Sequence, residues 1–144
     1  MMVIPNSTGL EKPGVIPQAP ANPHYRMAGG EQGIRELVER FYALMDELPE
    51  AQAIRALHPA DLSHAKERLF MFLSGWLGGP PLYEERFGHP RLRQKHLPFP
   101  IGDAERDAWM LCMTRALDEV IADAALRIQL TQSFFKTADF LRNL

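Results

Sequence analysis

Residues 78–102 contain five prolines and four glycines, and this segment limits the fold more than any other feature of the chain. Proline cannot continue a helix, and glycine weakens one, so the segment has room for one or two helical turns at most. These turns are predicted near "YEERF" (83–87) and "RLRQKH" (91–96). A stretch of this length without regular structure is unusual in a compact domain, and we expect it to be functional.

Apolar residues recur at helical spacing on both sides of this segment, and they predict four substantial helices. The first ends before Pro49 and the second before "GGPP" (78–81), with Asp61 or Ser63 as its N-cap; Asp103 is the expected cap of the third. A short helix is predicted between Pro49 and His58. The four apolar faces are Ile34, Leu37, Val38, Phe41, Met45 and Leu48; Leu62, Ala65, Leu69, Phe72, Leu73, Trp76 and Leu77; Trp109, Cys112, Met113, Ala116, Leu117, Val120 and Ile121; and Leu126, Leu130, Phe134, Thr137, Ala138 and Leu141.

No segment shows the alternating pattern of a strand, so the predicted fold class is all-α. With 144 residues and 46% hydrophobic residues, the chain fits one domain. Residues 1–23 hold five prolines among polar residues without periodicity, and we expect a disordered tail there and a folded domain over 24–144.

Charge and cysteine content narrow the class of protein further. The formal net charge is -2, which argues against a nucleic-acid partner, and no apolar run is long enough for a membrane span. The single cysteine, Cys112, excludes an internal disulfide and a cysteine-only zinc site. These observations predict a cytoplasmic, soluble protein, which we expect to be a monomer or a weak dimer.

His96 lies at the end of a basic run and just before Pro98. Leu92 and His96 are four residues apart, so one helical turn would place both on the same side. The spacing alone leaves two interpretations open. The commoner one is a loop histidine whose ring is satisfied by a backbone carbonyl, and the other is a metal-binding imidazole with its backbone fixed on both sides. A zinc cluster with other histidines lacks the usual spacing of ligands.

Large aromatic and sulfur-containing side chains are more numerous than a small four-helix core easily packs. A tight aromatic core is the simpler explanation, and a cofactor pocket is the alternative. Tyr42 lies at the shoulder of the first apolar face, and Trp109 lies fully within the third. Each would bring a hydrogen-bond donor into the interior, where a buried donor needs a partner.

Five motifs together resemble the group II truncated haemoglobins. The resemblance covers about residue 24 to the end of the sequence, and its most specific part is "GHPRLRxxHxPFxI" followed by "DAW". The motifs are "RFY" (40–42), "HPADL" (58–62), "RLFMFLSGWLGGPPLY" (68–83), "GHPRLRQKHLPFPI" (88–101) and "ERDAWMLCM" (105–113).

The resemblance implies a two-over-two helical sandwich around a b-type haem, with His96 as the proximal iron ligand on a very short helix. It implies distal hydrogen bonding to the bound ligand from Tyr42, His58 and Trp109, with Ala65 and Leu69 on the distal helix. The basic run then supplies propionate partners, chiefly Arg93. The haem contacts implied in this way are His96, Phe72, Leu73, Tyr83, Arg93, Phe99, Ile101, Trp109 and Met113.

Three functions follow as alternatives. The first is reversible binding of O₂, CO, NO or related small ligands. The second is an enzyme on the same scaffold that oxidises nitric oxide with O₂ or reduces peroxide; since the sequence has no flavin or nicotinamide motif, it would need an external reductase. The third is a haem-free helical interaction module, which would be colourless when purified.

Overall fold

The structure, a computed structural model, describes residues 23–144, and these form eight α-helices and one 3-10 helix without a strand. The predicted all-α class is confirmed. The predicted tail falls, apart from Pro23, on residues outside the described ones. The helices are α1 (His24–Met27), α2 (Gly30–Glu47), the 3-10 helix η2 (Pro49–Ala51), α3 (Gln52–Arg55), α4 (Ser63–Trp76), α5 (Leu82–Phe87), α6 (Leu92–His96), α7 (Asp103–Val120) and α8 (Ala124–Phe140).

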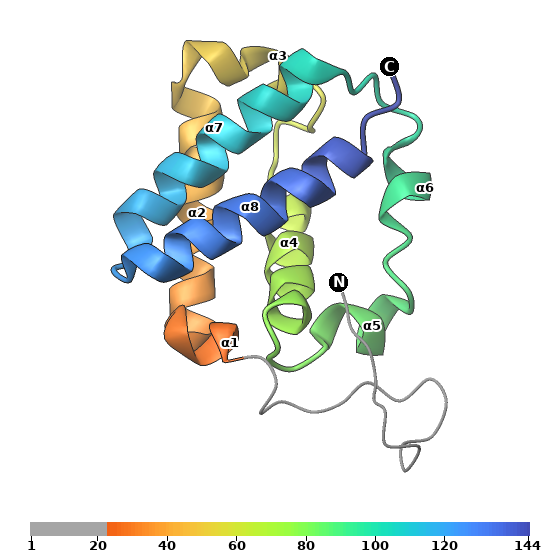
Figure 1. Cartoon of the computed structure of the whole chain (residues 1–144). Helices are drawn as coiled ribbons and strands as arrows, with labels where there is room; N and C mark the ends of the chain where they lie inside the picture. The colour runs from red at the N-terminus through yellow and green to blue at the C-terminus, as the bar shows by residue number, and fades with distance from the viewer. Residues whose placement is uncertain (1–22) are drawn as a thin grey trace.

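Four long helices make two layers. Helices α7 and α8 run side by side in opposite directions and cross in front of α2 and α4 (Figure 1). The most extensive contact is between α2 and α7, and the core lies where the layers cross. Fully buried side chains at this crossing include Phe41, Met45, Met113 and Leu117, each of which stabilises the fold by roughly 1.5–3 kcal/mol through burial.

Helix α2 begins at a pair of glycines and ends, as the sequence predicts, before Pro49. Gly29 and Gly30 both have positive φ values, of 99° and 65°, which a glycine adopts without strain. At the other end Leu48 is extended, as expected for a residue before proline, and Pro49 opens η2. Between them, the eight buried residues of α2 all lie on one face of the helix.

The predicted N-caps of α4 and α7 are each displaced by one residue. Leu62 is the N-cap of α4, and Asp61 instead accepts hydrogen bonds from the backbone N–H and hydroxyl of Ser63. For α7 the N-cap is Gly102, whose N–H donates to Glu105 at 2.8 Å, and Asp103 is the first helical residue. In both cases the carboxylate that accepts from an N–H at the start of the helix belongs to a residue other than the N-cap: Asp61 for α4 and Glu105 for α7.

The proline-rich segment contains two short helices, as predicted. Helix α5 buries Tyr83, whereas α6, the helix that carries His96, has no buried residue. Arg91, just before α6, is the single non-glycine residue with positive φ (48°) among residues 23–144. In Figure 1, α6 stands apart from the crossed helices, beside the end of the chain. Within the described part of the chain, no helix is both long and apolar enough to cross a membrane.

Candidate functional site

A cavity of about 360 Å³ lies between the two helical layers and the segment that carries α6. This volume is within the range typical of small-molecule and cofactor pockets. Its wall is mostly aromatic and aliphatic, with a few polar groups at separate points. The apolar part of the wall includes Leu57, Leu69, Phe72, Leu73, Trp76, Leu92, Phe99, Ile101, Phe134, Ala138 and Leu141.

His96 reaches this cavity from α6, and one nitrogen of its ring is already engaged. Its Nδ1 lies 2.6 Å from the backbone oxygen of Leu92, one helical turn earlier. Because a carbonyl oxygen can only accept, Nδ1 carries the proton and donates, and the neutral ring keeps its lone pair on Nε2. The hydrogen bond fixes both the tautomer and the ring plane, which is how proteins orient an imidazole that binds a metal.

Tyr42 of α2 and Trp109 of α7 line the same cavity. Neither the Tyr42 hydroxyl nor the Trp109 indole N–H forms a hydrogen bond with another residue among 23–144. Burial raises the pKa of Tyr42, so its hydroxyl stays protonated. Trp109 is partly exposed, although the sequence placed it fully within a core-facing stripe. The cavity is therefore lined by two hydrogen-bond donors that the described part of the chain leaves unpaired.

His58 also lines the cavity, and its tautomer limits what it can do there. Its Nδ1 lies 2.9 Å from the backbone oxygen of Ile54, so Nδ1 donates and the neutral ring presents Nε2 as an acceptor. The rings of His58 and Tyr42 pack edge to face with centroids 5.8 Å apart. A neutral His58 can thus accept from a hydroxyl, whereas only the charged ring can donate from Nε2.

A continuous series of aromatic contacts holds this wall of the cavity together. Tyr42 packs on Phe41 at 4.9 Å between centroids, Phe41 on Trp109 at 5.0 Å, Trp109 on Phe134 at 5.7 Å and Phe134 on Trp76 at 4.6 Å. Each such pair contributes roughly 0.5–1.5 kcal/mol beyond its burial. The series links α2, α4, α7 and α8, so the positions of Tyr42 and Trp109 depend on all four long helices.

Four residues expected at the site do not line the cavity. Ala65 is partly buried against the core, and Met113 is fully buried in it. Arg93 donates to the backbone oxygen of Phe140 at 2.6 Å. Lys95, from the same basic run, donates to the hydroxyl of Tyr83 at 3.0 Å, and neither residue lines the cavity. The remaining expected residues, His96, Phe72, Leu73, Phe99, Ile101, Trp109, Tyr42, His58 and Leu69, all line it.

The sequence did not indicate that Glu105, Arg106 and Thr137 line the cavity. Arg106 is paired with Asp139 at 2.8 Å and with Asp107 at 2.9 Å, and these carboxylates raise the pKa of its guanidinium. Its position was available in principle, because it lies three residues before Trp109 on the same helix and so shares that helix's face. Arg106 therefore provides a basic group at the cavity, whereas the expected basic residue, Arg93, donates to Phe140.

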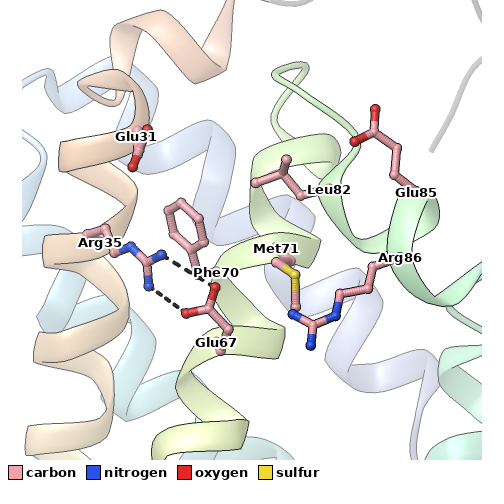
Figure 2. Close-up of a pocket in the computed structure, with 8 residues that line it drawn as sticks. All are labelled: Glu31, Arg35, Glu67, Phe70, Met71, Leu82, Glu85 and Arg86. Atoms are coloured by element: carbon pink, nitrogen blue, oxygen red, sulfur yellow. Dashed lines mark hydrogen bonds and ion pairs between the residues drawn. The ribbon is translucent and has the colours of Figure 1, made fainter.

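A second hollow, open to the surface, lies between α2, α4 and α5 (Figure 2). Arg35 forms a two-pronged ion pair with Glu67 at 2.9 and 3.4 Å, and its guanidinium lies 3.7 Å from the centre of the Phe70 ring. Glu31 and Glu85 stand at the sides of the hollow (Figure 2). The pair joins α2 to α4, and its half-exposed charges are worth about 0.2–1 kcal/mol.

Comparison with known proteins agrees with this geometry. Residues 24–143 match the bacterial-like globin family. The group II two-on-two haemoglobin of Agrobacterium tumefaciens shares 49% identity over 83% of this chain and 92% of its own, with a TM-score of 0.80. A group 2 truncated haemoglobin of Bacillus subtilis is 41% identical over 68% of this chain and 72% of its own.

The crystal structure described as truncated oxygen-avid haemoglobin from Bacillus subtilis has a TM-score of 0.75 and 38% identity, over 85% of this chain and 99% of that one. The family match covers nearly all of the described residues, and the crossed helices reproduce the two-on-two arrangement of the solved structures. The chain therefore belongs to the bacterial-like globins and, within them, to the group II truncated haemoglobins.

Proposed function

We propose that the cavity holds a b-type haem with His96 as the proximal ligand, and that the chain binds O₂ and related diatomic ligands such as CO and NO. One observation carries this proposal. His96 lines an apolar cavity, and its Nδ1–H donates to the backbone oxygen of Leu92. The neutral ring then keeps a lone pair on Nε2. A neutral imidazole held in this way is the ligand that globins use for iron.

The other residues of the cavity fit the same group. Phe72, Phe99 and Ile101 supply apolar surface for a flat macrocycle, and Arg106 supplies a cation for its carboxylates. Cys112 is fully buried and does not line the cavity. Because it is the chain's single cysteine, a thioether link to the haem is not available, which supports a non-covalent, b-type cofactor.

A histidine-ligated haem iron supplies a site for diatomic ligands, and the chain's own residues set how such a ligand is held. The Tyr42 hydroxyl and the Trp109 indole N–H have no hydrogen-bond partner among residues 23–144, so either can donate to a ligand in the cavity. Hydrogen bonds that stabilise developing charge are worth about 1.5–3 kcal/mol each. Two such donors favour slow release of O₂ and hence tight binding, and the solved relative from Bacillus subtilis is described as oxygen-avid.

His58 orients a donor in this proposal. With Nε2 as an acceptor and its ring against that of Tyr42, the neutral imidazole can accept from the Tyr42 hydroxyl. His58 then competes with the bound ligand for the hydrogen bond from the Tyr42 hydroxyl. A change of His58 to an apolar residue would free Tyr42 for the ligand, whereas loss of a direct donor would weaken ligand binding.

Replacement of the ligand nitrogen tests the proposal. Wild-type protein should purify with a haem absorption band, and His96→Ala should lose most of it. The matched control is His64→Ala, which changes an exposed histidine of α4 that does not line the cavity. A His96→Ala protein with the wild-type haem content and spectrum would overturn the assignment of His96, and a colourless wild-type protein that cannot be loaded with haem would overturn the function.

A further inference from the structure

Helix α6 carries His96, yet packing does not hold it in place. None of its five residues is buried, and the exposed Leu97 follows it directly. Pro98 and Pro100 stiffen the chain beyond it but cannot attach it to the core. A ligand histidine must nevertheless be held within a fraction of an ångström, so contacts from elsewhere have to fix the segment.

Those contacts come from Asn143, whose side chain makes three hydrogen bonds to the segment that follows α6. Its Nδ2 donates to the backbone oxygen of His96 at 3.3 Å and to that of Phe99 at 2.8 Å. Its Oδ1 accepts from the N–H of Ile101 at 3.0 Å. The backbone N–H of Asn143 also donates to the oxygen of Ile101 at 2.8 Å. One side chain thus connects both ends of residues 96–101.

The end of α8 presents Asn143 from an anchored position. Arg142 pairs with Asp139 at 2.7 Å and with Asp103 at 3.2 Å, and Arg106 pairs with Asp139 at 2.8 Å. Arg93 of α6 bonds to the oxygen of Phe140 in the last turn of α8. Figure 1 shows the end of the chain beside the connection from α6 to α7. The anchor therefore rests on α7 and α8, both of which pack in the core.

We propose that Asn143 is a positioning residue that holds the His96 turn against the cavity and thereby sets the strength and geometry of the histidine–iron bond. This inference rests on the proposed function. The carbonyl of Leu92 fixes the His96 ring relative to α6, and Asn143 fixes the backbone of His96 relative to the core. Together they place Nε2 at one position, and without Asn143 the turn can move as a unit.

Two variants of Asn143 and one surface control on α8 test the amide's contacts. Asn143→Ala removes all three side-chain hydrogen bonds. Asn143→Asp keeps the acceptor for Ile101 but places a carboxylate oxygen against the carbonyls of His96 and Phe99. Lys136→Gln is the matched control, because it changes an exposed residue of α8 that forms no ion pair or hydrogen bond with the described part of the chain.

Amide hydrogen exchange of the purified full-length protein gives a readout that does not depend on ligand binding. In Asn143→Ala the Ile101 N–H loses its partner and should exchange faster than in wild type, whereas in Lys136→Gln it should exchange at the wild-type rate. An unchanged Ile101 exchange rate in Asn143→Ala would overturn the proposal, because the contacts would not hold the segment in solution.

Two haem measurements test the positioning itself. Both Asn143 variants should transfer haem to an excess of apomyoglobin about tenfold faster than wild type, as expected when hydrogen bonds worth about 1.4 kcal/mol are lost. Their iron–histidine stretching band in resonance Raman spectra should shift or broaden. Wild-type behaviour of both variants in both measurements would overturn the proposal, and so would an equal effect of Lys136→Gln.

Failure of this inference is distinguishable from failure of the proposed function. If His96→Ala retains the iron–histidine band, then the ligand is another residue and the proposed function is wrong in its central assignment. If His96→Ala loses the band and the Asn143 variants keep the wild-type band and rate of haem transfer, His96 is the ligand but Asn143 does not position it.

Discussion

Two histidines that line the cavity form the same local hydrogen bond. In both His58 and His96, Nδ1 donates to the backbone oxygen of the residue four positions earlier, Ile54 or Leu92. The bond leaves Nε2 as a lone-pair nitrogen in each neutral ring. The surroundings of the two rings differ: His58 packs against the Tyr42 ring, whereas His96 sits on a turn with no buried residue. The same tautomer therefore leaves His58 able to accept a hydrogen bond near Tyr42 and His96 able to bind a metal.

Trp109→Phe should speed O₂ dissociation by roughly 10- to 100-fold if its indole N–H donates to the ligand, since such a bond is worth about 1.5–3 kcal/mol. Stopped-flow displacement of O₂ by CO measures the rate. Trp76→Phe is the control, because Trp76 also lines the cavity and stacks on Phe134. Equal rates for Trp109→Phe and wild type would mean that the indole does not reach the ligand.

Cys112 should be inert in the folded protein. It is fully buried, and burial raises the pKa of its thiol to about 11, so almost none of it is thiolate at pH 8. We expect negligible labelling by iodoacetamide under native conditions and complete labelling in denaturant, measured by mass spectrometry. Rapid labelling of the native protein at pH 8 would show that α7 opens readily around this residue.

At the scale of the elements, α1 and α2 approach so closely that a side chain cannot be added between them. A Cβ on Gly33 would lie 1.8 Å from the backbone oxygen of Ala28. Neither partner can rotate away, because both contacting groups belong to the backbone. The short helix α1 is further attached by the N–H of Tyr25, which donates to the oxygen of Leu77 beyond α4. The absence of a side chain at Gly33 therefore allows the end of α1 to pack closely against α2.

Gly33→Ala should destabilise the protein by roughly 1–3 kcal/mol, the usual cost of forcing atoms into a packed site. Urea unfolding followed by circular dichroism gives the difference. Gly102→Ala serves as the control, since a Cβ there meets its nearest atom, Glu105 Oε1, at 3.4 Å and the φ of Gly102 is negative. Gly33→Ala with the stability of wild type would mean that α1 shifts freely on α2.

The helices were predictable to the extent that the pattern of apolar residues determines them. Periodicity correctly predicted α2 and the two short turns in the proline-rich segment, because proline and helical spacing act locally. The N-caps of α4 and α7 were each misplaced by one residue, because Asp61 and Glu105 satisfy the first N–H groups from neighbouring positions. Which residue caps a helix depends on backbone angles that the residue type alone does not determine.

Parts of the site depend on tertiary structure and could not be read from the sequence. Arg93 and Arg106 are both basic residues near His96, and local pattern gives no means of choosing between them. The structure distinguishes the two residues. Arg93 donates to the backbone oxygen of Phe140 at the end of α8, whereas Arg106 lines the cavity. The role of Asn143 is likewise invisible in sequence, since its partners lie more than forty residues away.

At the scale of the whole molecule, a network of ion pairs joins the start of α7 to the end of α8. Asp139 of α8 is held by Arg106 of α7 and by Arg142, and Arg142 also reaches Asp103 at the start of α7. The two guanidinium groups lower the pKa of Asp139 below its ordinary value. The network therefore fixes the end of α8 against α7, just before Asn143.

Asp139→Asn should make the protein less stable than wild type at pH 7, and the difference should shrink below about pH 4, near the ordinary aspartate pKa. Because the carboxyl has a lower pKa when folded than when unfolded, its pairing stabilises the fold at higher pH and is lost as the pH falls through the folded-state pKa. Urea midpoints at pH 7 and pH 3 measure the effect.

The control for this comparison is Glu84→Gln, which changes an exposed residue of α5 that forms no ion pair with the described part of the chain. It should leave the difference between the two pH values unchanged. If Asp139→Asn and wild type show the same stability difference between pH 7 and pH 3, the network does not contribute to folding.

The chain has two tryptophans, and both line the same cavity. Any strongly absorbing, flat molecule bound there would lie within a few ångströms of each indole and would quench its emission by energy transfer. Intrinsic fluorescence is therefore a label-free optical signal of occupancy in which no distant tryptophan contributes a background. Titration of this signal would count binding sites and follow the loss of a bound group in real time, without any substitution in the protein.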